Sequence, residues 1–156
     1  MEGVWAKTYP EAIEKISSMG HIIGNHTINH PNLPNLSNSQ KIIDELTGMN
    51  DLVKELYNYE MKYLRPPEGV YSEKVLSIAK DLGFKTVFWS FAYKDWDTNS
   101  QKGKDYALSQ ITPYLHDGAV LLLHAVSKDN ADAMADIIDY SRSQGYEFAS
   151  LDEIIP

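Results

Sequence analysis

The sequence contains no cysteine among its 156 residues. The chain therefore cannot form a disulfide scaffold, a thiolate zinc site or a cysteine nucleophile. Its longest apolar run covers only residues 119–123, far too short to cross a bilayer, and its N-terminal residues resemble neither a signal peptide nor a transit peptide. Basic residues are not clustered and are outnumbered by acidic ones, 14 to 22, which argues against a nucleic-acid partner.

The composition is that of a folded protein. Apolar residues make up 43% of the chain and aromatic residues 11%, which is too much for a disordered segment. Neither an internal repeat nor a low-complexity linker interrupts the sequence. We therefore expect a single domain over residues 1–156.

Segments with helical and β-like patterns alternate along the chain. Helical spacing of apolar residues predicts helices over residues 9–19, 39–56, 72–82, 106–115 and 131–143. Short β-like runs cover residues 21–24, 62–65, 85–93 and 119–126, and residues 146–154 are expected to supply the last strand and turn. This order predicts an α/β fold with a mainly parallel sheet, either open or closed into a barrel, whose ligand site lies at the carboxyl ends of the strands.

The first candidate site is the histidine pair in GNHTINHP. His26 and His30 are four residues apart, so on one face of a helix both imidazoles would reach a single cation. A capping or surface role explains the same spacing. The pair alone does not decide between the two.

A second group of candidates follows two later strands. His124 ends the most hydrophobic strand, where it is either a core histidine or a proton shuttle. Asp95 is either the carboxylate that orients this histidine or a turn residue. Trp96 suits a sugar face as well as a protein core.

A third candidate is Arg65, which precedes two prolines. A guanidinium on such a rigid turn suits either a fixed carboxylate contact or a surface ion pair. Glu68 lies in the same turn, where its backbone N–H is of more interest than its carboxylate.

The segments GHIIGNHTINHPNL, YLRPPEGVYS, VFWSFAYKDW and VLLLHAVSKDNADAM, in this order, resemble the polysaccharide deacetylases of carbohydrate esterase family 4, the NodB-homology domains. Within that family the chain looks most like the delta-lactam-biosynthetic de-N-acetylases, which act on muramic acid in spore-cortex peptidoglycan. The resemblance covers essentially the whole chain. It implies a distorted (β/α) barrel, a divalent metal that is commonly zinc, an N-acetylated glycan as partner and a location outside the cytoplasmic membrane.

The resemblance also implies a role for each candidate along the chain. His26 and His30 match the two metal-binding histidines, and Arg65 matches the arginine that braces the catalytic aspartate. Glu68 matches the turn position whose backbone N–H helps to hold the developing oxyanion. Tyrosine is frequent there in the wider family and arginine in the close subgroup, so this glutamate is a departure that alters the sugar-facing rim.

The later motifs carry the remaining implied roles. Asp95 matches the residue that tunes the catalytic histidine, and Trp96 matches a wall of the groove. Leu122 and His124 match the LxH motif, in which the leucine lines the acetyl pocket and the histidine acts as general acid. The implied reaction is metal-assisted hydrolysis of an acetamide.

One family motif, TFDDG or TFDNG, has no counterpart in this sequence. In the family it supplies the catalytic base and a third metal ligand, an aspartate. We therefore expect an incomplete barrel without its first strand, helix and second strand, and weak or no turnover. Two hypotheses of different class follow: an incomplete metal-dependent deacetylase, acting on muramic acid or alternatively on N-acetylglucosamine or chitin oligomers, and a non-catalytic carbohydrate-binding remnant.

Overall fold

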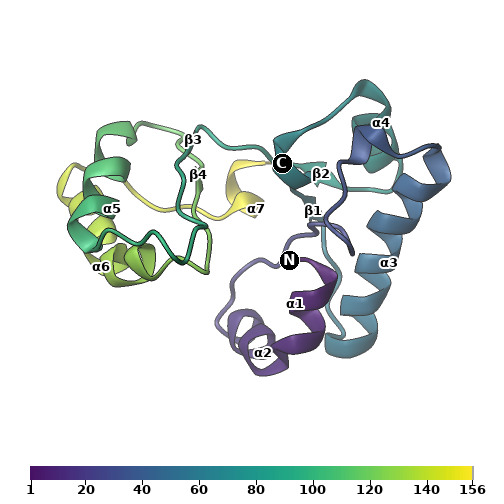
Figure 1. Cartoon of the computed structure of the whole chain (residues 1–156), viewed down its shortest axis with the longest axis horizontal. Coiled ribbons are helices and arrows are strands. Elements are labelled where there is room, and N and C mark those ends of the chain that lie inside the picture. Colours follow the sequence, from purple (N-terminus) through teal and green to yellow (C-terminus); the bar gives the residue numbers. More distant parts are fainter. Residues whose placement is uncertain (156) are drawn as a thin grey trace. The chain divides into compact units, whose positions relative to one another are not determined.

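The computed structural model describes residues 1–155 of the chain. The chain divides into two compact units, Met1–Phe88 and Trp89–Pro156. Figure 1 traces unit 1 from purple to teal and unit 2 from teal to yellow. The prediction of a single domain over residues 1–156 stays a prediction.

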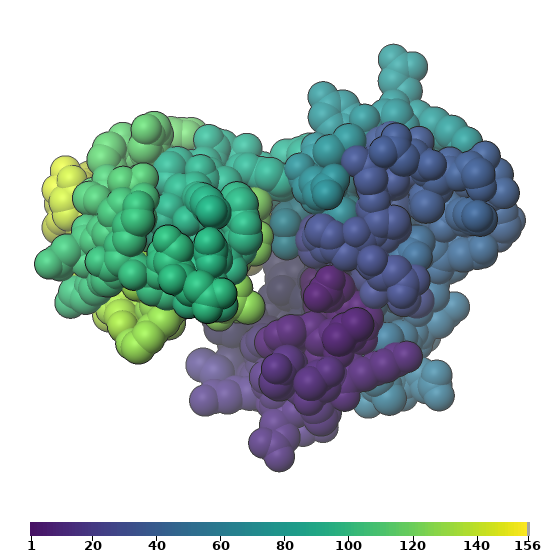
Figure 2. All heavy atoms as spheres, in the orientation of Figure 1, coloured from purple at the N-terminus to yellow at the C-terminus, as the bar shows by residue number. Residues whose placement is uncertain are grey.

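Unit 1 combines helices with one parallel strand pair. Its helices and strands are α1 (Gly3–Thr8), α2 (Pro10–Ser18), η1 (Leu33–Asn35), α3 (Ser39–Tyr57), β1 (Tyr63–Leu64), η2 (Pro67–Gly69), α4 (Glu73–Asp81) and β2 (Lys85–Thr86). Figure 1 shows α3 as the long helix of this unit, with the N-terminal helices beside it, and Figure 2 shows the N-terminal segment in purple on the surface. The side chain of Asn38 caps α3 by accepting from the N–H of Lys41, so the predicted start at Ser39 has a local cause.

Parallel pairing in unit 1 places the segment before the histidines beside β1. Tyr63 of β1 pairs with Lys85 of β2, and Asn25 forms a parallel bridge with Leu64 on the other side. Two buried clusters hold this unit together. The first packs α3 and α4 against β1 and consists of Leu33, Ile42, Leu46, Leu64, Val75, Ala79 and Phe84. The second packs α1 and α2 against α3 and consists of Ala6, Ile13, Ile23, Met49, Val53 and Met61. This packing fixes the strand ends from which the candidate residues emerge.

Unit 2 is built around a second parallel pair. It contains β3 (Phe91–Ala92), α5 (Lys104–Ile111), η3 (Thr112–Tyr114), β4 (Leu121–Leu122), α6 (Lys128–Ser143) and α7 (Leu151–Ile154). Phe91 pairs with Leu121 and Ala92 with Leu122. The buried cluster of this unit consists of Phe91, Ala107, Ile111, Ala133 and Ile137.

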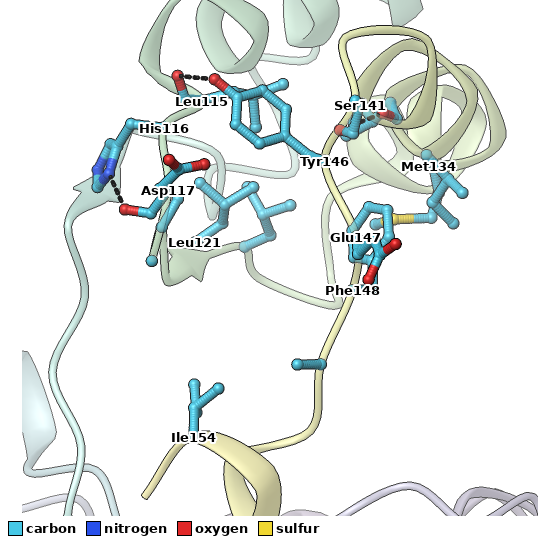
Figure 3. A pocket seen from close by; sticks show the side chains of 17 residues that line it. Leu115, His116, Asp117, Leu121, Met134, Ser141, Tyr146, Glu147, Phe148 and Ile154 are labelled. Carbon is cyan, nitrogen blue, oxygen red and sulfur yellow. Dashed lines mark hydrogen bonds between the residues drawn. The ribbon is translucent and has the colours of Figure 1, made fainter.

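A cavity of about 650 Å³ lies on one side of β4. Figure 3 shows the side chains that line it, among them Leu121, Tyr146 and Phe148. Leu121 and Leu123 line this cavity, whereas the alternate residues Leu122 and His124 do not. That alternation is the period of two of an extended chain, and it separates the cavity from the candidate residues.

The predicted α/β class is confirmed, and both strand pairs are parallel. The described residues form two two-stranded sheets and do not close a barrel. The strand predicted over residues 85–93 is wrong in its continuity, because its first part pairs in unit 1 and its last part pairs in unit 2. The strand predicted after residue 145 is also wrong: within residues 1–155 no strand pairs with that segment, which ends in α7.

The helix predicted over residues 9–19 begins one residue later, at Pro10, and the preceding helix α1 was not predicted. None of the helices in the described part of the chain combines the length and the apolar character that crossing a membrane requires.

Candidate functional site

His26 and His30 lie next to each other, but not on a helix. Their ring centroids are 4.8 Å apart in an edge-to-face arrangement. Thr27 and His30 have φ values of 66° and 52°, in the left-handed region that ends a right-handed helix. The prediction that the pair shares a helical face is therefore wrong. A tight bend after the bridge at Asn25 brings the rings together instead.

His26 is held in one tautomer. Its Nδ1 lies 2.6 Å from the carbonyl oxygen of Arg65, which can only accept, so Nδ1 carries the proton. The lone pair is then on Nε2, as it is in most metal-ligating histidines. Burial, reinforced by the positive charge of Arg65, lowers the pKa of His26 to about 3. The ring is therefore neutral near neutral pH.

The bend between the two histidines is strained and is held by buried polar groups. A β-branched residue at positive φ, as Thr27 is here, costs on the order of 1–3 kcal/mol. The Thr27 N–H donates to Oδ1 of Asn25 at 2.8 Å, and Oγ1 of Thr27 accepts from the His30 N–H at 3.0 Å. Asn25 is itself fixed by donation to the carbonyl oxygen of Leu46 at 2.8 Å. Asn25 and Thr27 were not recognised as supporting residues from the sequence, although each is adjacent to His26.

The turn after β1 carries the next two candidates. The Arg65 N–H donates to the carbonyl oxygen of Asn25 at 3.0 Å, and burial lowers the pKa of the Arg65 guanidinium. Glu68 is exposed, has a left-handed φ of 58°, and its carboxylate accepts from Nδ2 of Asn32 at 3.1 Å. The Glu68 side chain is thus tied to the segment that follows the histidine pair.

In unit 2, the buried carboxylate of Asp95 pairs with the partly exposed ring of His124. Oδ1 of Asp95 lies 2.6 Å from Nδ1 of His124, and Oδ2 accepts from the His124 backbone N–H at 2.7 Å. Asp95 is only 3% exposed. A carboxylate that accepts from both the ring and the backbone of one histidine fixes the orientation of that ring and leaves Nε2 to meet another group.

Two further residues of unit 2 were missed by sequence reasoning. The buried side chain of Asn130 donates to Oδ2 of Asp95 at 2.6 Å and accepts from the hydroxyl of Tyr93. Burial, and then the charges of Asp95 and Asp129, raise the pKa of Tyr93 to about 12, so its hydroxyl remains a donor. Asn130 shares the inner face of α6 with Ala133 and Ile137. A polar residue at an otherwise apolar helical spacing is the sequence signal that could have identified Asn130.

Trp96 and Leu122 complete the candidates of unit 2. The Trp96 side chain is 53% exposed, and its ring centroid lies 5.4 Å from that of His124. Leu122 lies on β4, two residues before His124. An exposed indole beside the paired histidine offers an apolar face to a ligand.

The candidates therefore fall into two groups. Unit 1 joins His26 and His30 and holds Arg65 and Glu68 in the turn beside them, and unit 2 joins Asp95, Trp96 and His124. Within the described residues, no three His, Cys, Asp or Glu side chains are placed to hold one metal ion. His26 and His30 fit two ligand positions of a divalent metal because both are imidazoles in contact and one has its tautomer fixed.

Comparison with known proteins identifies relatives over nearly the whole chain. Peptidoglycan-N-acetylmuramic acid deacetylase PdaA of Bacillus subtilis is 46% identical over 154 residues, which are 98% of this chain and 58% of PdaA. A peptidoglycan-N-acetylglucosamine deacetylase of Bacillus cereus is 29% identical over 150 residues, which are 94% of this chain and 53% of that protein. The chain thus spans less than two thirds of the length of these relatives.

Solved structures give the same result for the fold. The structure of Bacillus subtilis PdaA, a family 4 carbohydrate esterase, superposes with a TM-score of 0.92 over 97% of this chain and 65% of PdaA. A family 4 pseudoenzyme from Bacillus anthracis, 27% identical, superposes with a TM-score of 0.89 over 99% of this chain and 53% of the pseudoenzyme. Residues 1–87 match the family described as polysaccharide deacetylase. The chain belongs to the polysaccharide deacetylase family.

Proposed function

We propose that this chain carries the site of a metal-dependent deacetylase that removes the acetyl group from an amino sugar of peptidoglycan, with muramic acid as the preferred residue. The observation that carries the proposal is the hydrogen bond between the buried Asp95 and the partly exposed His124, with 2.6 Å between Oδ1 and Nδ1. The relationship to PdaA supports the choice of muramic acid. A cell-wall substrate places the reaction outside the cytoplasmic membrane, and a role in sporulation is part of the proposal.

His26 and His30 would hold the divalent metal, which we propose to be zinc. When bound, the metal supplies Lewis-acid polarisation of the acetamide carbonyl and acidifies water. His26 suits this role, because its neutral ring donates Nδ1–H to the Arg65 carbonyl and keeps the lone pair of Nε2 available for the metal. Within the described residues no third His, Cys, Asp or Glu side chain joins this pair, so we expect only slow turnover by this chain.

His124 serves as general acid. Asp95 accepts from Nδ1, so the second proton of the imidazolium lies on Nε2, from which it passes to the departing sugar amine. The carboxylate also compensates the positive charge of the protonated ring. Trp96 would offer its exposed face to the sugar, Leu122 would line a pocket for the acetyl methyl, and Glu68 would shape the rim. Arg65 matches the position that braces a catalytic aspartate in the family, and the described residues do not supply that aspartate.

A second candidate substrate is N-acetylglucosamine, in peptidoglycan or in chitin oligomers. The exposed carboxylate of Glu68 favours it, because muramic acid without its peptide carries a lactyl carboxylate that would meet a like charge at this rim. A third candidate is a non-catalytic carbohydrate-binding protein. The two-ligand histidine pair and the likeness to a family 4 pseudoenzyme favour that alternative.

Acetate release and glycan binding, measured side by side, test these functions. The chain is supplied with zinc and either peptide-free muramic glycan or chitin oligomers, and His124→Ala serves as the inactive control. We expect slow acetate release that a chelator and His124→Ala both abolish, and that is faster on the muramic glycan. Faster release from chitin oligomers selects the second candidate, glycan binding without acetate selects the third, and neither binding nor release refutes all three.

A further inference from the structure

The bend between His26 and His30 needs support from outside itself. Thr27 and His30 both have left-handed backbone conformations, which non-glycine residues rarely adopt. Such conformations persist only where surrounding contacts over-determine them. The bonds to Asn25 and Thr27 lie within the bend, so residues 28 and 29, between the two histidines, require a separate anchor.

The Gly3 N–H donates to the carbonyl oxygen of Ile28 at 3.1 Å, and the carboxylate of Glu45 on α3 is the side-chain anchor. Oε2 of Glu45 accepts from the backbone N–H groups of Ile28 at 3.0 Å and of Asn29 at 2.9 Å. Oε1 accepts from Nδ2 of Asn29 at 2.7 Å. One carboxylate thus accepts three hydrogen bonds from the two residues that precede His30, and ionised acceptors make the stronger bonds.

The packing around Glu45 keeps the bend close to α3. A Cβ built on Gly48 would lie 2.8 Å from Cδ1 of Ile28, so the absence of a side chain at Gly48 permits this approach. Glu45 itself lies between buried positions of α3, beside Leu46, which is fully buried in the core. The carboxylate is therefore attached to a rigid element.

We propose that Glu45 is a positioning residue for the histidine pair: by holding residues 28 and 29 against α3, it keeps the rings of His26 and His30 close enough to share one divalent metal ion. This inference rests on the proposed function, which assigns the pair to the metal. Loss of a group bonded directly to a ligating histidine typically weakens metal affinity by about 10- to 100-fold, and we take this range for Glu45, which acts through the backbone before His30.

The test uses three variants on one helix. Glu45→Ala removes the anchor. Glu45→Gln keeps an oxygen for the two backbone N–H groups but turns an NH₂ group toward Nδ2 of Asn29. Asp44→Ala is the matched control, since it removes the same charge from the neighbouring exposed residue. Among the bonds described, the Asp44 carboxylate accepts only from Gln40, which lies on the same helix. Zinc affinity is measured by calorimetry, the proximity of the His26 and His30 rings by NMR without metal, and folding by circular dichroism.

We expect Asp44→Ala to match the wild type. Glu45→Ala should bind zinc about 10- to 100-fold more weakly, with its fold intact and its two imidazole rings no longer adjacent, and Glu45→Gln should fall between them. Wild-type affinity together with adjacent rings in Glu45→Ala would overturn the proposal. If the wild type does not bind zinc, the metal role under the proposed function is wrong, and the ring proximity alone then decides the role of Glu45. If Glu45→Ala does not fold, Glu45→Gln decides by the same two readouts.

Discussion

Replacing Asn130 with alanine tests the polar network that holds the Asp95–His124 pair. The side chain is 3% exposed and makes two hydrogen bonds, one to the Asp95 carboxylate and one from the Tyr93 hydroxyl. A net hydrogen bond to a charged group is worth about 1.5–3 kcal/mol and a neutral one about 0.5–1.5 kcal/mol. Asp95 keeps its two bonds from His124, so we expect Asn130→Ala to lower the free energy of unfolding by about 2–4 kcal/mol.

The measurement is urea denaturation followed by tryptophan fluorescence. Trp89 and Trp96 lie in unit 2, so a Trp5→Phe background makes the signal specific to the unit that contains Asn130. Asn99→Ala is the control, because Asn99 is exposed and exposed substitutions change stability by less than about 0.5 kcal/mol. A loss for Asn130→Ala no larger than that of the control would show that Asn130 does not stabilise Asp95.

The substitution Asn130→Asp sharpens the same test through its pH dependence. It places a second carboxylate where Nδ2 lies 2.6 Å from Oδ2 of Asp95. Two like charges at that distance repel, so the variant should be less stable than Asn130→Ala near neutral pH. Acidification should reverse the order, because one shared proton restores a hydrogen bond between the two carboxyl groups. An unchanged order at acidic pH would contradict this account.

Three further predictions concern separate parts of the chain. The tyrosinate absorbance that Tyr93→Phe removes should titrate at about 12; since this folded pKa lies above the ordinary value of 10.0, the associated stability is present below pH 10 and is lost as pH rises toward 12. Leu64→Ala should cost about 2–5 kcal/mol in urea denaturation because Leu64 is fully buried, whereas Leu56→Ala, at a position 48% exposed, should cost far less. His26→Ala should abolish zinc binding in calorimetry, while His21→Ala, on an exposed residue, should leave it unchanged.

The longer helices were predictable because they have local signals, whereas the short helices α1 and α7 were not predicted. Apolar spacing and the cap at Asn38 locate α3, and the cap at Ser72 locates the start of α4. The strands were less predictable than the helices. The apolar run over residues 85–93 reads as one strand, yet its two ends pair with different partners in different units. Strand pairing is a long-range property, and nothing within the run marks where one partner ends and the next begins.

Sequence patterns nominate the candidate residues but do not show how they come together, and their roles stay predictions. The spacing of His26 and His30 fits a helix, and only the left-handed conformations of Thr27 and His30 reveal a bend. Thr27 is an improbable residue for positive φ, so local propensity argued against the conformation that the tertiary contacts impose.

Two of the supporting residues that sequence patterns did not reveal, Glu45 and Asn130, share one property. Glu45 stands beside the buried stripe of α3 and Asn130 within that of α6, and each directs its polar end to a loop that carries candidate residues. A polar side chain in that position costs free energy unless it is hydrogen-bonded, so its presence implies a partner at the loop. A reading based on apolar periodicity assigns such a residue to the solvent-facing side of the helix, or regards it as a break in the apolar pattern. Read instead as an obligatory hydrogen-bonding group, it predicts which loop the helix holds in place.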